Sequence, residues 1–213
     1  MSSPRNNRFE IIQPGISISS KFSTNGTIGL IVYDLKNNNN PCILSNWHII
    51  ARKGYYVRRG KWPIYQPGRA VQGKVSKNII AEYVRHHKGT DSAIAKIISR
   101  DFEVKQYETN AIITSTRIPK KGDIVEKSGV KTGITRAVID KVNGSRVKMI
   151  PITKDPDYEI SMSGDSGSIW YDPKTMEGLV LHNHGENSKS NNERAWGWSL
   201  VTVMQKLDIS LTS

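Results

Sequence analysis

Short runs of β-branched and aromatic residues recur along almost the whole chain, and turn sequences such as Asn25-Gly26 and Asn143-Gly144 separate them. Many short runs at regular intervals are typical of an all-β barrel or sandwich. The expected strands are Gly15–Ser19, Thr27–Tyr33, Cys42–Ser45, Gly54–Val57, Ile79–Tyr83, Ala93–Ile98, Asp123–Lys127, Ile134–Val142, Lys148–Ile152, Ser168–Tyr171 and Gly178–Leu181.

Helical periodicity is convincing only near the end of the chain, in "LVTVMQKLDI". Leu200, Val203, Met204 and Leu207 would share one face of such a helix. The 213 residues suffice for one large or two small domains. We interpret "TRIPKKG" at 116–122 as a hinge. We therefore expect an N-terminal tail at 1–14, a first β unit at 15–115, and a second β unit with the helix at 120–213.

The stretch "SMSGDSGSIWYD" at 161–172 contains a small, polar, glycine-rich turn directly before an apolar run. The turn raises the question of whether Ser166 is a nucleophile. A serine hydroxyl is a poor nucleophile at neutral pH, so it needs a base within hydrogen-bond reach, and the base needs an orienting group.

Among five histidines, His48 stands where the apolar run "PCILSNW" ends, a usual place for a catalytic group. For the acid, Asp91 follows a Gly-Thr turn and precedes an alternating small and apolar run, "SAIAKI". Asp101 and Asp34 are alternatives, although their surroundings are polar and loop-like.

The motifs "LSNWHI", "GTDSAIAKI" and "GDSGS", in that order, resemble those of the chymotrypsin/trypsin-like serine peptidases. The stretches "VEKSGVKTGITRAVIDKV" at 125–142 and "WGWSLVTVMQKLDIS" at 196–210 resemble the second barrel and C-terminal helix of bacterial members. The resemblance covers about residues 15–210 and is closest to the compact, disulfide-free bacterial and plant-type branch. It implies two six-stranded antiparallel β-barrels with a short C-terminal helix, and a serine endopeptidase without cofactor or metal.

The resemblance also implies the roles of individual residues. Ser166 would attack the peptide carbonyl to form an acyl-enzyme, His48 would move the proton, and Asp91 would orient His48. The backbone N–H groups of Gly164 and Ser166 would form the oxyanion hole.

By the same resemblance, Ile160 stands at the base of the specificity pocket, six residues before the serine, where trypsin-like enzymes carry Asp. Leu181, His182 and Asn183 would form another side of this pocket. Cleavage after Lys or Arg is therefore expected to be poor, and small, apolar or acidic residues should do better. His182 could favour an acidic residue, or it could be a rim residue.

The resemblance raises a question about Asp165. In secreted relatives the equivalent aspartate pairs with a new N-terminal ammonium after cleavage. Nothing upstream resembles an activation site, and the polar "MSSPRNNRFE" suits the surface. We expect activity without N-terminal cleavage. A buried Asp165 needs another partner: backbone N–H groups, Ser163, Ser168 or Thr132, or exposure to water.

The net charge of +12 is concentrated between residues 51 and 90, where ten basic residues stand against one acid, Glu82. Such a segment attracts polyanions, so weak binding of nucleic acid or an acidic protein is expected beside a peptide substrate. It also supports a rival interpretation, a binding or capsid-like module that keeps the fold with little or no proteolysis. A third interpretation is that the basic segment only makes the surface more soluble.

Cys42 is the only cysteine and is expected to be a buried structural thiol. A metal site from His182, His184 and a further His or Cys42 is a second rival, but no metal-ligand spacing supports it. The absence of disulfides, of a secretory signal and of an apolar run long enough for a membrane span leads us to expect a cytoplasmic protein.

Overall fold

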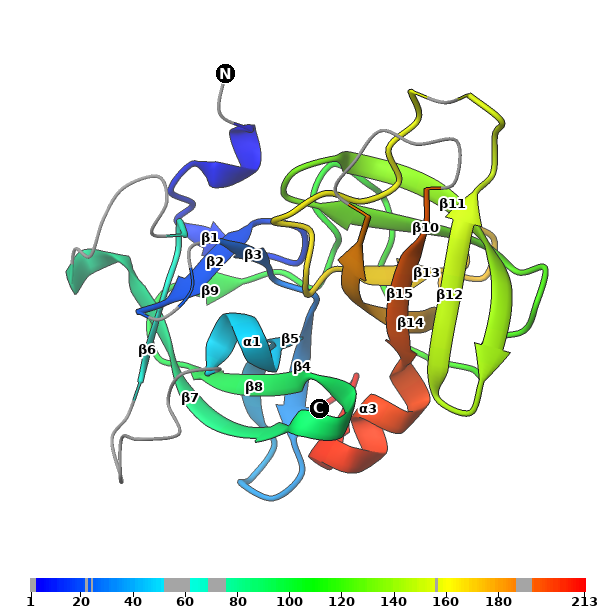
Figure 1. Cartoon of the computed structure of the whole chain (residues 1–213). Helices are drawn as coiled ribbons and strands as arrows, with labels where there is room; N and C mark the ends of the chain where they lie inside the picture. Colours follow the sequence, from blue (N-terminus) through cyan, green and yellow to red (C-terminus); the bar gives the residue numbers. More distant parts are fainter. Residues whose placement is uncertain are drawn as a thin grey trace.

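The computed structural model describes residues 3–21, 23, 25–51, 62–68, 76–155, 157–186 and 193–213. Figure 1 shows two β units side by side, one from each half of the chain, with helix α3 (Leu200–Leu207) below them. The architecture is all-β, as expected.

Among the described residues, the first half forms an eight-stranded sheet with the order β16-β4-β5-β8-β7-β6-β2-β3. Its strands are β2 (Ser17–Ser20), β3 (Gly26–Thr27), β4 (Leu30–Asp34), β5 (Asn40–Asn46), β6 (Pro63–Tyr65), β7 (Ile79–His87), β8 (Ser92–Ile97) and β16 (Ile209–Ser210). The core of this half is built mainly from isoleucine and alanine. Branched side chains of this kind fit a pleated, half-buried surface, which is why these runs form strands.

The second half is a closed antiparallel barrel of six strands in the order β10-β11-β12-β15-β14-β13. The strands are β10 (Ile124–Gly129), β11 (Gly133–Asn143), β12 (Arg146–Pro151), β13 (Ile169–Tyr171), β14 (Gly178–Gly185) and β15 (Ala195–Ser199). In β11, Thr135, Ala137 and Ile139 are buried while alternate residues are more exposed. This period of two places one face of the strand inside the barrel.

Several short elements belong to the first half. The 3₁₀ turns are η1 (Pro4–Asn6), η3 (Ser76–Asn78) and η4 (Lys88–Thr90), the helix α1 spans Trp47–Ile50, and β1 (Ile11–Ile12) pairs in parallel with β9 (Asp101–Phe102). After α3, strand β16 returns to the first sheet and pairs with β4. One apolar cluster joins residues of both halves, including Leu44 and Leu181, to Leu200 of α3.

Most expected strands and the C-terminal helix are confirmed, while Gly54–Val57 lies outside the described residues. Two details differ. The first half has eight described strands, because the C-terminal strand joins it. The expectation that the first ten residues lie at the surface is wrong for Arg5 and Asn6, which are 2% and 9% exposed.

Candidate active site

His48 and Asp91 meet because their neighbouring strands pair. Strand β5 leads into α1, which carries His48, and β8 starts directly after Asp91, with Asn46 of β5 opposite Ser92 of β8. The backbone N–H of His48 donates to Asp91 Oδ1 at 3.0 Å, and His48 Nδ1 lies 2.5 Å from Asp91 Oδ2. Of the three acids considered from the sequence, Asp91 is therefore the one bound to His48, and it leaves His48 Nε2 for other contacts.

Asn183, from β14 of the other half, completes the surroundings of Asp91. Its side-chain Nδ2 donates to Asp91 Oδ2 at 2.5 Å. Two donors, from His48 and Asn183, thus reach one carboxylate oxygen. Asn183 was expected beside a substrate pocket; it lines the cleft described next, and its amide also binds the acid.

Ser166 lies on the same cleft as His48 and Asp91. A cavity of about 410 Å³ is lined by Trp47, His48, Lys88, Asp91, Ser166, Asn183 and His184. The hydroxyl of Ser166 donates to the backbone oxygen of Asn183 at 2.9 Å. This hydroxyl makes no hydrogen bond to His48 in the described part of the chain.

We call residues 162–167 the serine loop. Gly164 has φ +114° and Gly167 has φ +97°, conformations that favour glycine. Thr27 of β3 fixes the loop from the first sheet: its N–H donates to the Ser166 oxygen at 2.8 Å, and its hydroxyl donates to the Gly164 oxygen at 2.9 Å. Within the described part of the chain, the N–H groups of Gly164 and Ser166 donate to no protein acceptor. Both are available to a ligand.

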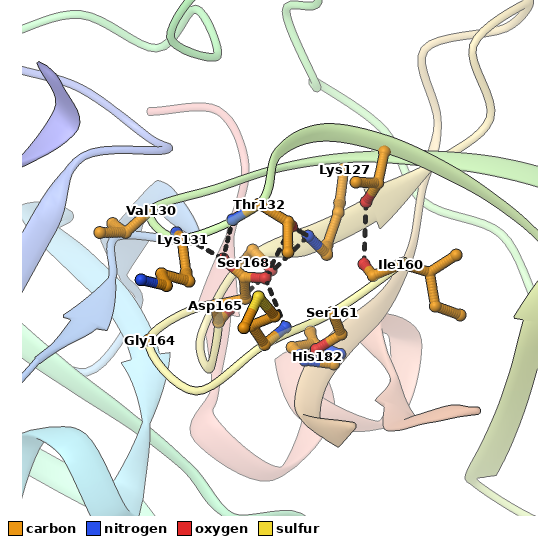
Figure 2. Close-up of polar contacts among 12 residues, drawn as sticks. Lys127, Val130, Lys131, Thr132, Ile160, Ser161, Gly164, Asp165, Ser168 and His182 are labelled. Carbon is orange, nitrogen blue, oxygen red and sulfur yellow. Dashed lines mark hydrogen bonds and ion pairs between the residues drawn. The ribbon is translucent and has the colours of Figure 1, made fainter. Parts of the chain in front are cut away.

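Asp165 points away from the cleft into the barrel, where Lys127 of β10 meets it (Figure 2). Lys127 Nζ lies 3.3 Å from Asp165 Oδ2, and neither side chain has exposed surface. The hydroxyl of Thr132 and the N–H of Met162 donate to the same oxygen at 2.7 and 2.9 Å. The N–H groups of Lys131 and Thr132 donate to the other oxygen.

Asp165 therefore does find partners other than an N-terminal ammonium. The expectation of Thr132 and backbone N–H groups is confirmed. The hydroxyl of Ser168 instead donates to the backbone oxygen of Asp165. Sequence reasoning missed Lys127, whose only signal was its place at the end of an expected strand, Asp123–Lys127.

Burial alone would raise the pKa of Asp165, but the Lys127 ammonium and the hydrogen bonds hold it below its usual range. Burial lowers the pKa of Lys127, and the charge of Asp165 opposes that shift. The pairing thus favours the charged form of Asp165, and for Lys127 it opposes the effect of burial.

The expected specificity pocket differs in detail. Ile160 and Leu181 have no exposed surface and pack in apolar clusters, so neither offers a side chain to the cleft. His182 is buried; its Nε2 lies 2.6 Å from Ser161 Oγ, and Trp170 Nε1 donates to its Nδ1 at 3.3 Å. Burial holds the pKa of His182 far below its usual range, so the ring is neutral.

Sequence reasoning also missed two polar neighbours of Ile160. One is Ser161. The other is Glu193, whose Oε1 accepts from the N–H of Ile160 at 2.5 Å and from the N–H of Ser161 at 3.0 Å. Burial raises the pKa of Glu193. A carboxyl group thus stands beside the position where the sequence offers only an isoleucine.

The described residues contain no group of three or more His, Cys, Asp or Glu side chains that could hold a metal ion. Cys42 is buried, as expected, and burial raises the pKa of its thiol to about 12. No helix in the described ranges is long and apolar enough to cross a membrane.

No protein-family model and no curated protein sequence matches the chain. Solved structures match it over nearly its whole length. One is a glutamic acid-specific serine protease that utilises a histidine triad in substrate binding; it is 15% identical, with a TM-score of 0.69, and the match covers 94% of this chain and 100% of that one.

Two further matches are a Nocardiopsis protease and protease A of Thermobifida fusca. Each is 13% identical with a TM-score of 0.67, and each match covers 95% of this chain. It covers 100% of the Nocardiopsis chain and 99% of the Thermobifida chain. The fold is that of the chymotrypsin-like serine proteases.

Proposed function

We propose that this protein is a serine endopeptidase in which Ser166 is the nucleophile, His48 the general base and Asp91 the group that orients His48. The observation that carries the proposal is the cleft that joins all three, with His48 Nδ1 bonded to Asp91. Asp91 holds the imidazole in the tautomer that leaves Nε2 free to accept the serine proton. His48 then gives this proton to the leaving amine.

The backbone N–H groups of Gly164 and Ser166 are proposed to stabilise the tetrahedral oxyanion. They have no acceptor among the described residues, and the Thr27 bonds fix the loop that carries them. Donors of this kind do not reorganise during the reaction. One of them typically lowers the activation free energy by about 3–4 kcal/mol.

The proposed substrate is a peptide with an acidic residue before the scissile bond. The Trp170 indole N–H can only donate, so its bond to His182 makes His182 Nδ1 the acceptor. His182 Nε2–H then donates to Ser161 Oγ, and the Ser161 hydroxyl, which is buried before a substrate binds, keeps its own hydrogen for a carboxylate. The matched glutamic acid-specific protease, which uses histidines in substrate binding, supports the same preference.

A fluorophosphonate probe tests the catalytic proposal. We expect labelling of the wild type that is insensitive to EDTA, and loss of labelling in Ser166→Ala and His48→Ala. Ser163→Ala changes an exposed serine of the same loop and should label normally. An unlabelled wild type would favour the binding-module alternative, and loss of labelling with EDTA that zinc restores would favour a metal hydrolase.

A peptide library tests the substrate proposal. We expect cleavage after Glu or Asp, lowered by Ser161→Ala. Dominant cleavage after Lys or Arg would contradict it and would assign Glu193 as the counter-charge of a basic residue.

Polyanion binding by the 51–90 segment stays a prediction, and much of the segment lies outside the described residues. Retention on heparin at low salt, lost as salt rises, is the expected result.

A further inference from the structure

Arg5 is a buried arginine near the start of the chain. It belongs to the turn η1, where the Ser3 hydroxyl accepts from the N–H of Arg5 and Pro4 occupies the first position. Farther along this segment, the Gln66 side chain accepts from the N–H of Phe9 and donates to the oxygen of Asn7. The segment is therefore fixed onto the first half of the molecule, with Arg5 pointing inward.

The guanidinium of Arg5 binds three groups. Nη1 donates to Ser128 Oγ at 2.5 Å and to the Gly15 oxygen at 3.2 Å, and Nη2 donates to Glu108 Oε2 at 2.7 Å. It also lies 5.0 Å from the centre of the Tyr107 ring. Ser128 passes its own hydrogen to the Tyr107 oxygen. Ser128 is thus held from both sides by groups of the first half.

Ser128 belongs to the hairpin of residues 127–133, whose other face holds Asp165. Successive residues of a strand point to opposite faces, so Lys127 points at Asp165 while Ser128 points at Arg5. Figure 2 shows Lys127, Lys131 and Thr132 of this hairpin around Asp165. At Gly129 the fit is so close that an added Cβ would lie 2.6 Å from Asp165 Oδ1. A shift of the hairpin must therefore move Asp165.

We propose that Arg5 is a positioning residue for the serine loop, acting through Ser128 and the 127–133 hairpin on Asp165. The inference rests on the proposed function, since the loop carries Ser166 and the proposed oxyanion donors. The N-terminal segment thereby supports the active geometry without a cleavage step, through a side-chain guanidinium on the outside of the hairpin. The ammonium of Lys127 acts from the inside.

The experiment compares full-length Arg5→Met with the wild type in fluorophosphonate labelling at several probe concentrations. A displaced loop lowers the maximal labelling rate by about 10–100-fold, because small misplacements and weakened oxyanion donors act on the transition state. The half-saturating probe concentration should change little, since binding before reaction does not use the oxyanion donors. Affinity for a peptide boronate should fall with the labelling rate, while affinity for a cleaved product peptide should not.

Three variants make the result specific. Arg8→Met removes an arginine from the same segment, one that pairs with exposed Glu10, and should react like the wild type. Arg5→Lys should restore part of the rate, because an ammonium reaches Ser128 or Glu108 but cannot serve both. Ser128→Ala should label more slowly than the wild type. The double variant Arg5→Met/Ser128→Ala should label at nearly the same rate as Arg5→Met if both residues act through one contact.

An unchanged labelling rate in folded Arg5→Met would overturn the inference. The inference would also be overturned if the labelling rate fell only in proportion to the fraction of unfolded protein, and if the affinities for the boronate and for the product peptide fell equally. If Arg5→Met does not fold, Ser128→Ala decides alone, and a wild-type rate in it overturns the inference. A wild type that does not label at all would instead overturn the proposed function.

Discussion

Lys127 is a lysine without exposed surface inside a β-barrel. Burying a charge is costly unless a partner and hydrogen bonds compensate, and here Asp165 and the Thr132 hydroxyl provide both. The Trp170 ring adds a third contact, 5.3 Å from the ammonium. The pair thus fixes the residue next to Ser166 by contacts that belong entirely to the second barrel.

Replacing Lys127 by methionine should leave the Asp165 charge buried without its ammonium. We expect the free energy of unfolding to fall by about 3–5 kcal/mol, as for other broken buried pairs. The matched control is Lys148→Met, which breaks a half-exposed pair with Asp140 and should cost at most about 1 kcal/mol. Denaturant titration measures both, and equal losses would contradict a stabilising role for the buried pair.

The same pair predicts how stability depends on acid. Because the pKa of Asp165 is depressed in the folded protein, the unfolded chain binds a proton more readily. The contribution of Asp165 is therefore present above a pH of about 4 and is lost as the pH falls below it. In urea titrations, wild-type stability should fall more steeply with acid than that of Lys127→Met/Asp165→Asn. If the unfolding free energies of the two proteins fell in parallel with pH, the Asp165 carboxyl would not control stability in acid.

At this scale the sequence predicts motif residues better than their partners. His48, Asp91 and Ser166 were found because each stands in a short, ordered motif, and the structure brings them to one cleft. Lys127 and Glu193 were missed because their partners lie 38 and 33 residues away, and only the closed barrel brings them together.

Among the elements, the linker between the halves, which we interpreted from the sequence as a hinge, makes several contacts with the second barrel. Arg117 donates to Asp123 at 2.7 Å, to Asp172 at 2.9 Å and to Glu177 at 3.2 Å. Next to it, the Thr116 hydroxyl donates to the Gly178 oxygen. The hydrogen bonds to Asp123 and Asp172 raise the pKa of Arg117 above its usual value, although burial opposes the shift. The linker is thus bound to the second barrel.

Substituting Arg117 by methionine should therefore release the linker and leave three carboxylates close together. We expect a loss of about 1–3 kcal/mol, the range of a hydrogen bond to a charged group, since the site is partly open to solvent. Arg117→Lys should recover little, because an ammonium cannot reach three acceptors in a fork. Lys121→Met, at an exposed position of the same linker, is the control; a similar loss there would point to a general charge effect.

Elements were predictable where one property repeats along them. The alternation in β11 and the apolar face of α3 are local patterns, so their positions follow from the sequence. The parallel pair of β1 with β9 and the return of β16 to β4 are not local, because two-residue strands carry no periodicity. Their pairing depends on contacts with strands that lie far away in the sequence.

For the molecule as a whole, the two halves exchange their ends. Arg5 of the N-terminal segment binds Ser128 in the second barrel, and β16 at the far end of the chain extends the first sheet. Arg85 of β7 further binds the oxygens of Leu207 and Asp208 at the end of α3. Neither half keeps all its contacts if the other unfolds.

Calorimetry should therefore show one unfolding transition, with equal van't Hoff and calorimetric enthalpies. A substitution in the second barrel, such as Lys127→Met, should move this whole transition to lower temperature. A second transition left at the wild-type temperature would show that the halves unfold separately.

The exchange of ends also orders events during synthesis. A ribosome makes the chain from its N-terminus, so β4 lacks its neighbour β16 until residue 210 has emerged, after every strand of the second barrel. An incomplete sheet edge has unpaired N–H and C=O groups and an uncovered apolar surface. A growing chain therefore cannot finish its first sheet early, and cells that stall translation of this protein near its end would hold a form with one strand edge open to other chains.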